Sequence, residues 1–363
     1  MEFHVTQENL NKALQTVARI ANSRGTLPIL GNILFKIKNK RLCVSATNLD
    51  IAISEFVGAK IINEGSLTIP ARLTQDLISS LPPETIEIKQ NDHKLHITSG
   101  SYSSIINGVA ADEFPVMPAI DDGEEWSIPA NVFKKALQQV VFAASNDETR
   151  PVLTGVYFHS QQKNLYIAAT DSYRLAEKTI TKNPSKSSLI VPATAANDLL
   201  RIISDDDQQI LVQHNDQQVL FKISETELIA RLIEGKYPDY KKLIPKNFQV
   251  TAELDKQELV NIVKVSSLFA RESAGGIKLI IDQKEQNLSI KSIASQVGEN
   301  NASAPAKVKG SGEITLNSRY ILDGLQSIDS KVVSMGFNGK LDPVVLQGVD
   351  EKEYVHIVMP LKS

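Results

Sequence analysis

Cysteine is almost absent from this chain, with Cys43 the single one in 363 residues. One thiol excludes a disulfide within the chain and a zinc cage of thiolates, and it is typical of reducing compartments. The sequence also lacks the roughly 18 consecutive apolar residues of a membrane-spanning helix. The start, Met-Glu-Phe-His-Val-Thr, has neither the basic nor the apolar part of a secretion signal. We therefore expect a cytoplasmic protein that binds no membrane.

Charge of one sign does not dominate either. Lys and Arg number 39 against 42 Asp and Glu, which gives a net charge of −3. A nucleic-acid partner would have to meet a local basic surface, because the bulk charge does not attract phosphate. Apolar residues make up 42% and charged residues 22%, as in ordinary globular proteins, and the length allows two to four domains.

Common catalytic and nucleotide-binding motifs are missing. The sequence contains no GxGxxG, GxxxxGK[ST], GxSxG or HExxH. The six histidines are scattered, and the close pair His93 and His96 is three positions apart on a predicted strand, so the two side chains face opposite ways. We expect no metal and no cofactor.

An internal repeat is the strongest positive signal. Pro28 recurs as Pro151, a distance of 151 − 28 = 123 residues. Ala46-Thr47 recurs as Ala169-Thr170 at the same distance, and Val358-Met359-Pro360 marks a fainter third copy. Such long units favour arrayed globular domains over a solenoid, whose repeats usually run about 20–50 residues. The predicted domains are residues 1–120, 127–245 and 250–363.

Each repeat changes its hydrophobic period in the same order. In the first repeat, Leu10, Leu14 and Val17 lie on one stripe of a helix, and β-rich runs follow. A second helix over about 72–81 ends at Pro82-Pro83 and precedes further alternating runs. The pattern predicts an α+β fold of three similar domains in tandem, each with two helices on antiparallel sheets.

One segment has catalytic residue types. Residues 168–176 place Asp171, two hydroxyls and Arg174 at a strand end, which suits general acid–base chemistry, a capped turn or a binding surface. The corresponding residues 46–52 of the first repeat likewise begin with Ala-Thr and continue into a polar turn. This correspondence argues for scaffold rather than catalysis.

Basic residues fall on the polar sides of the predicted helices, while acidic residues gather in loops such as 121–125 and 204–207. A solvated helix face is the ordinary interpretation. Segregated charge also suits a phosphate backbone.

Four runs, at 150–153, 169–176, 235–240 and 358–361, closely resemble the β subunit family of bacterial DNA polymerase III, the sliding clamps. The resemblance covers the whole chain in order. It implies a non-enzymatic subunit that forms a head-to-tail homodimeric ring of six subdomains. Duplex DNA would pass through the ring without sequence specificity, and the polymerase would gain processivity.

The resemblance also implies partners and contact residues. Expected partners are the replicative polymerase's catalytic subunit, the clamp loader and other proteins with a clamp-binding motif. Arg24 and Arg150 match basic family positions near DNA, and a dimer seam pairs the region of Ile106 with Leu268 and Phe269. Together with the basic helix positions, the expected DNA-facing residues are Lys12, Arg24, Arg72, Arg150 and Arg201.

Partner motifs are expected in a pocket between the second and third repeats. In this chain Ser172-Tyr173 replaces a common Gly-His, and Lys242 replaces a common Arg, so the preferred motif can differ. The wall carried over from the family is Leu153, Thr170, Ser172, Tyr173, Arg174, Leu175, Pro238, Lys242, Leu243, Val344, Leu346, Ile357, Met359 and Pro360, flanked by Asn317 and Tyr320.

Two other hypotheses compete with the clamp. One is a three-domain enzyme that uses Asp171 and Arg174. The other is a scaffold that binds peptides and forms no ring.

Overall fold

The computed structural model describes residues 1–21, 27–115, 120, 122–180, 187–294 and 298–361. The chain forms two compact units, and we describe each by itself. The first unit comprises Met1–Asn131 and Arg201–Leu232, and the second comprises Val132–Leu200 and Ile233–Ser363.

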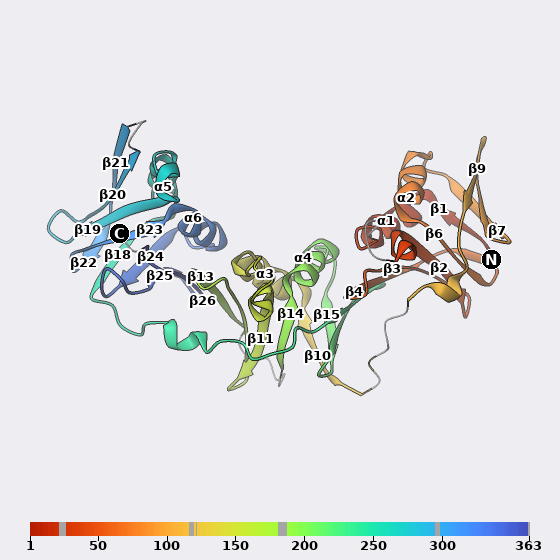
Figure 1. The fold of residues 1–363 in the computed structure, drawn as a ribbon, viewed down its shortest axis with the longest axis horizontal. Coiled ribbons are helices and arrows are strands. Elements are labelled where there is room, and N and C mark those ends of the chain that lie inside the picture. The colour runs from red at the N-terminus through yellow and green to blue at the C-terminus, as the bar shows by residue number, and fades with distance from the viewer. Residues whose placement is uncertain (22–26, 116–119, 121, 181–186, 295–297, 362–363) are drawn as a thin grey trace. The chain divides into compact units, whose positions relative to one another are not determined.

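The first unit is built on two antiparallel sheets (Figure 1). The five-stranded sheet has the order β5-β1-β7-β8-β9, and the eight-stranded sheet has the order β10-β15-β16-β17-β4-β3-β2-β6. Its elements are β1 (Glu2–Thr6), α1 (Gln7–Val17), β2 (Asn32–Lys38), β3 (Arg41–Thr47), β4 (Ile51–Val57), β5 (Lys60–Asn63), β6 (Gly65–Pro70), α2 (Ala71–Ser80), β7 (Thr85–Asn91), β8 (Lys94–Ser99), β9 (Tyr102–Asn107), β10 (Glu124–Pro129), β15 (Gln209–His214), β16 (Gln218–Ile223) and β17 (Thr226–Arg231).

The second unit contains a nine-stranded sheet, β14-β11-β12-β13-β26-β25-β24-β18-β22, and a four-stranded sheet, β21-β20-β19-β23. The helix α3 begins at the boundary of the two units. The remaining elements are α3 (Ala130–Val140), β11 (Gly155–Gln161), β12 (Asn164–Thr170), β13 (Arg174–Ile180), β14 (Ser188–Pro192), α4 (Ala193–Ile202), β18 (Val250–Asp255), α5 (Lys256–Leu268), β19 (Gly276–Asp282), β20 (Asn287–Ala294), β21 (Gly298–Pro305), β22 (Lys307–Lys309), β23 (Gly312–Asn317), α6 (Ser318–Ser327), β24 (Val332–Phe337), β25 (Val344–Gly348) and β26 (Glu351–Val358).

Local sequence explains the helices. In α1 the stripe of Leu10, Leu14 and Val17 is buried, and the Thr6 hydroxyl accepts a hydrogen bond from the Asn9 amide at the amino end. The second helix, predicted over about 72–81, is α2. The prediction of an α+β fold with antiparallel sheets is confirmed, since the described residues contain six α-helices and every pairing between their strands is antiparallel.

The repeat appears in the order of the elements. The strands β2, β3 and β4 return as β11, β12 and β13, each 155 − 32 = 123 positions later. The last strand of a repeat then pairs with the third strand of this series in the preceding repeat. Thus β17 pairs with β4 over five residue pairs, and β26 pairs with β13 over five. Sheet hydrogen bonds therefore cross both repeat boundaries.

In the part of the chain that the structure describes, no helix combines the length and the apolar character that crossing a membrane would require.

Packing of α6 against β26 depends on one glycine. A Cβ atom at Gly324 would approach the buried His356 ring more closely than carbon atoms allow. We predict that Gly324→Ala lowers the free energy of unfolding by about 1 kcal/mol, because overpacking outweighs the helix propensity gained. Urea denaturation measures the change.

Two further variants test the cause. In a His356→Ala background the same Gly324→Ala substitution should raise stability, since the clash is gone. Gln326→Ala, at an exposed site of the same helix, should not destabilise. A loss of stability from Gly324→Ala that persists in the His356→Ala background would contradict the proposed clash.

Candidate functional site

The nine-stranded sheet of the second unit has two distinct faces. Phe158 of β11 packs against Phe133 of α3, with ring centroids 5.9 Å apart, so side chains in phase with Phe158 face the helices. Successive side chains of a strand alternate between faces. The register from β11 through β12 to β13 shows which side chains alternate with those on the Phe158 face, and Tyr157 and Leu175 are among them. These side chains form the opposite face of the sheet, here called the outer face.

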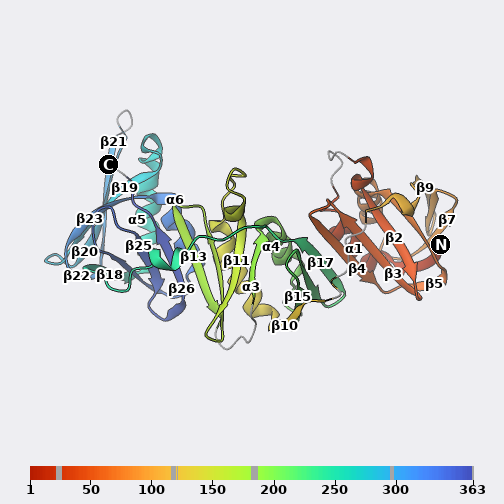
Figure 2. The same ribbon diagram turned by 60° about the horizontal axis from the view of Figure 1, so that its bottom comes forward.

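A segment without regular strands, residues 233–249, crosses the outer face (Figure 2). We call it the crossing segment. The Ile233 amide donates to the Ile190 carbonyl of β14, and Tyr237 stacks on Tyr157 of β11 at 4.7 Å. Farther along, Phe248 lies against Gly336 of β24. The buried side chains between segment and sheet, here the outer cluster, are Leu153, Ala168, Leu175, Ile190, Tyr237, Tyr240, Val345 and Ile357.

The structure brings together part of the pocket expected from sequence. Leu153, Leu175 and Ile357 belong to the outer cluster, and the partly buried Met359 packs against it. The Met359 amide donates to the Tyr173 carbonyl at 2.8 Å, which places the exposed Tyr173 at the same strand end.

Other expected wall residues lie around this cluster. Thr170 ends β12 on the outer face, and its amide donates to the Tyr237 hydroxyl at 3.1 Å. Pro238, Lys242 and Leu243 are exposed on the crossing segment, and Pro360 follows Met359 half-buried.

Two expected wall residues need correction. The register pairs Leu175 with Ile357 and Ile357 with Val345, so these three side chains share the outer face. Val344 and Leu346 alternate with Val345, face the helices and are fully buried. A shift of one residue along a strand reverses its face. Val345, which lies between them on β25, is therefore the residue of this strand that belongs to the outer cluster.

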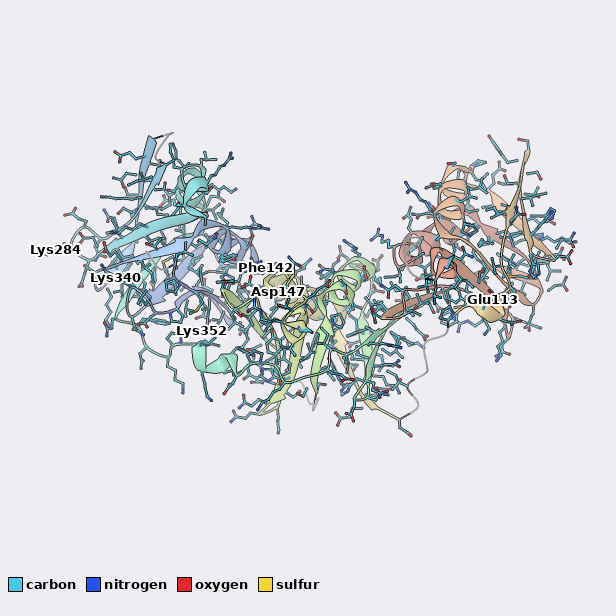
Figure 3. All side chains as sticks on the ribbon, in the orientation of Figure 1. Glu113, Phe142, Asp147, Lys284, Lys340 and Lys352 are labelled. Carbon is cyan, nitrogen blue, oxygen red and sulfur yellow. The ribbon has the colours of Figure 1, made fainter. Side chains whose placement is uncertain are left out.

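Arg174 projects to the helix side rather than into the outer cluster. Its guanidinium pairs with Asp323 of α6, donates to the Phe142 carbonyl at 2.7 Å and lies 4.8 Å from the centroid of the Tyr320 ring. Phe142, whose carbonyl accepts this hydrogen bond, is labelled in Figure 3. Asn317, the other flanking residue, accepts from the Arg319 amide and begins α6. Arg174 thus joins strand to helix.

The Asp171 carboxylate makes its hydrogen bonds within the turn that precedes Arg174. One of its oxygens accepts from the amides of Tyr173 and Arg174, both at 2.9 Å, and the other pairs with the Arg174 guanidinium at 3.0 Å. Ser172 has a φ of 78°, in the left-handed region. Of the three interpretations of this segment, the structure shows the capped turn.

The expected DNA-facing residues are found in different settings. Lys12 lies on α1, Arg72 on α2 and Arg201 in the last turn of α4, and all three are exposed. Arg24 lies outside the described residues. Arg150 belongs to no helix: it pairs with Asp147, labelled in Figure 3, and donates to the Ser172 hydroxyl at 3.0 Å. It therefore borders the outer cluster rather than a helical face.

The residues expected at a dimer seam differ in their exposure. Ile106 is 4% exposed and points into the sheet packing, whereas Ile105 on the same strand is 58% exposed. Leu268, at the end of α5, is exposed as expected, and Phe269 caps that helix half-buried. Alternation along β9 assigns the exposed position to Ile105, since neighbouring residues face opposite sides.

Sequence reasoning missed a buried polar network beneath the crossing segment. The Tyr240 hydroxyl donates to the Glu177 carboxylate and lies 2.7 Å from Nε2 of His159. Burial and the nearby Lys241 lower the pKa of His159 to about 4, while burial and the Glu177 carboxylate raise the pKa of Tyr240. The sequence did indicate this packing, in the run Gly235–Tyr240. Two tyrosines within four positions of a segment outside the predicted strands favour packing of that segment against another surface of the protein.

Strand pairing across the repeats and packing characterise the described part of this structure. Its class is the sliding-clamp fold. The DNA polymerase sliding clamp of Bacillus subtilis matches with a TM-score of 0.95 at 28% identity, covering 100% of this chain and 99% of that one. The DNA polymerase III beta subunit of Pseudomonas aeruginosa matches with a TM-score of 0.95 at 25% identity and full coverage of both chains.

Family models then make the assignment specific. Models of the DNA polymerase III beta subunit match residues 1–118 (N-terminal domain), 127–239 (central domain) and 241–362 (C-terminal domain). The Beta sliding clamp of Synechococcus elongatus is 30% identical over 372 residues, covering 100% of this chain and 99% of its own length. The chain belongs to the DNA polymerase III beta subunit family. Beta sliding clamps are non-catalytic accessory subunits in DNA replication, so the prediction of a non-enzymatic protein is confirmed.

Buried histidines make stability depend on pH. Burial holds the pKa of His356 at about 3 and, with Lys241, that of His159 at about 4, against an ordinary value of 6.5. Below pH 6.5 the unfolded chain binds protons that the folded chain does not. We predict that the free energy of unfolding falls from about pH 6.5 toward about pH 4, by up to about 1.4 kcal/mol per pH unit for each histidine.

Urea unfolding at pH 7, 6 and 5 measures this slope. His159→Gln should make it shallower, because one of the histidines with a lowered pKa is gone. A variant whose slope equals that of the wild type would contradict the assignment of His159.

Proposed function

We propose that this chain gives the replicative polymerase its processivity by closing around duplex DNA as a head-to-tail homodimer. One observation carries the proposal. The last strand of the second and of the third repeat pairs with the preceding repeat, and the same rule leaves one open edge on each of two complementary strands in the described part of the chain. In this proposal the three domains are residues 1–120, 127–245 and 250–363, and two chains supply six of them.

The two strands are β9 and β21, each paired with one neighbour only among the described strands. As the last strand of the first repeat, β9 corresponds to β17 and β26, and it ends the five-stranded sheet. In the third repeat, β21 corresponds to β4 and β13, and it ends the four-stranded sheet. Open strand edges are templates for pairing with another chain. A second copy can therefore satisfy both edges by repeating the junctions already present within one chain.

Apolar side chains near these edges support the same pairing. Tyr102 and Ile105 are exposed on β9, and Leu268 and Ile293 are exposed on α5 and β20, which precede β21. Large exposed apolar groups mark interaction surfaces when they gather. Joining β9 to β21 is a heterologous contact, and two such contacts close a two-chain ring.

Enclosure explains how a chain of net charge −3 can work on DNA. A ring retains a duplex by topology, so it needs no base contacts, which would also oppose sliding. Weak attraction from exposed cations such as Lys12, Arg72 and Arg201 suffices to keep phosphates near the helices.

The outer cluster supplies the docking site for partner motifs. The partly buried Met359 and Ile244 pack against it, and Met359 is a pliable side chain suited to irregular apolar partners. The exposed Tyr173 is hydrogen-bonded to Met359 through its carbonyl, and the exposed Leu243 directly precedes Ile244. Arg150 and Lys242 add cations at the rim. The polymerase's catalytic subunit, the clamp loader and other motif-bearing proteins would dock here in turn.

Breaking the proposed edge contact should yield monomers. Ile105→Asp introduces a charge at the interface, and we predict that it weakens dimerisation at least about tenfold, or about 1.4 kcal/mol. Leu73→Asp, at a similarly exposed apolar site on α2, is the matched control and should leave the dimer intact. Sedimentation equilibrium measures both. Equal dimer stability in the two variants would place the interface elsewhere.

Topological binding has a distinct signature. We predict that the protein, once loaded by the clamp loader of its source organism, stays on a nicked circular duplex and leaves rapidly when the circle is linearised, because a ring escapes only at an end. Gel filtration of the labelled protein on both DNA forms measures retention. Similar retention on the two forms would contradict enclosure.

A further inference from the structure

The geometry points to Tyr240 as a positioning residue for motif binding, a role that rests on the proposed docking site. Through its hydroxyl, Tyr240 fixes the turn of residues 238–243 on the sheet. That turn presents Leu243, which is 46% exposed and directly precedes Ile244, a residue packed against the outer cluster. We infer that the fixed turn holds one side of the docking site in its binding position before a motif arrives.

Local structure gives this turn little support of its own. It contains a single short 3₁₀ helix, Tyr240–Leu243, whose preceding residue Asp239 makes no capping side-chain hydrogen bond. The backbone contributes bonds from the Tyr240 amide to the Pro238 carbonyl at 2.8 Å and from the Ile244 amide to the Lys241 carbonyl at 3.3 Å. Isolated turns of this length are not stable alone, so their placement depends on side chains.

Tyr240 provides that placement through a buried network. Its hydroxyl donates to Glu177 of β13, which is almost fully buried. Because the Tyr240 hydrogen points to the carboxylate, the oxygen accepts from Nε2–H of His159 on β11. Hydrogen bonds to an ionised group are the stronger kind. The network therefore ties the turn to two neighbouring strands.

A cation completes the arrangement next to the hydroxyl. Lys241 lies 3.5 Å from the Glu177 carboxylate, and its ammonium is 3.1 Å from the centroid of the Tyr166 ring on β12. Glu177 thus remains paired even if the Tyr240 hydroxyl is removed. This compensation makes a hydroxyl deletion a mild perturbation of the fold.

The other end of the turn has an independent anchor. Tyr237 stacks on Tyr157, and its hydroxyl accepts from the Thr170 amide. Loss of the Tyr240 hydroxyl consequently frees the Leu243 end while the Pro238 end stays attached. A motif would then have to order that end on binding, which weakens affinity without removing any contact surface.

The test measures binding of a fluorescein-labelled peptide that copies the clamp-binding segment of the replicative polymerase from the same organism. Fluorescence anisotropy gives its Kd for the full-length dimer. We expect Tyr240→Phe to raise the Kd about three- to tenfold. Tyr354→Phe removes a hydroxyl from the helix-facing side of β26, away from the outer cluster, and should leave the Kd unchanged.

A double-mutant cycle separates positioning from general destabilisation. Leu243→Ala should weaken binding, and adding Tyr240→Phe to it should cost little more, because the side chain being positioned is already gone. Glu177→Gln keeps an acceptor for the hydroxyl and should bind nearly as the wild type does, whereas Glu177→Ala should resemble Tyr240→Phe.

The outcomes distinguish the inference from the proposed docking site. No binding by the wild type, or no effect of Leu243→Ala, would overturn both. Wild-type binding that Leu243→Ala weakens and Tyr240→Phe leaves unchanged would overturn the positioning role alone. Additive losses in the double variant would do the same, since they would show that Tyr240 acts independently of Leu243.

Discussion

Antiparallel hydrogen bonding between the end of one repeat and the middle of the preceding one is the constraint on which the rest of this molecule depends. It joins β17 to β4 and β26 to β13, so each large sheet belongs to two repeats rather than one. Buried backbone groups need partners, and a strand at an open edge lacks half of them. By the same rule β9 and β21 each have one open edge among the described strands, and in the proposed dimer a partner chain fills both.

The proposed docking site lies at the second of these junctions. Where β26 meets β13, Ile357 lies beside Leu175 on the outer face, and the crossing segment covers the adjoining surface with Tyr237 and Tyr240. Part of this apolar row is thereby buried, and in the proposal its border binds partner motifs. The site consequently lies at a repeat boundary and draws on side chains from both repeats.

Polar residues at this boundary serve the architecture. Asp171 and Arg174, which could act as an acid and an electrophile in an enzyme, satisfy a turn and bind α6 instead. Glu177 and His159 hold Tyr240 under the crossing segment. These structural roles accord with a family of non-catalytic subunits.

The sequence by itself determined the repeat, the kind and order of the elements and the lack of catalytic motifs, because these follow from local periodicity and spacing. Tertiary structure alone decided which of two neighbouring residues faces outward. Val345, rather than Val344 or Leu346, lies on the outer face, and Ile105, rather than Ile106, is exposed, since strand register sets the face and a one-residue shift reverses it. The burial of Tyr240 likewise required strands some 60 residues away (240 − 177 = 63), and no local pattern encodes so distant a contact.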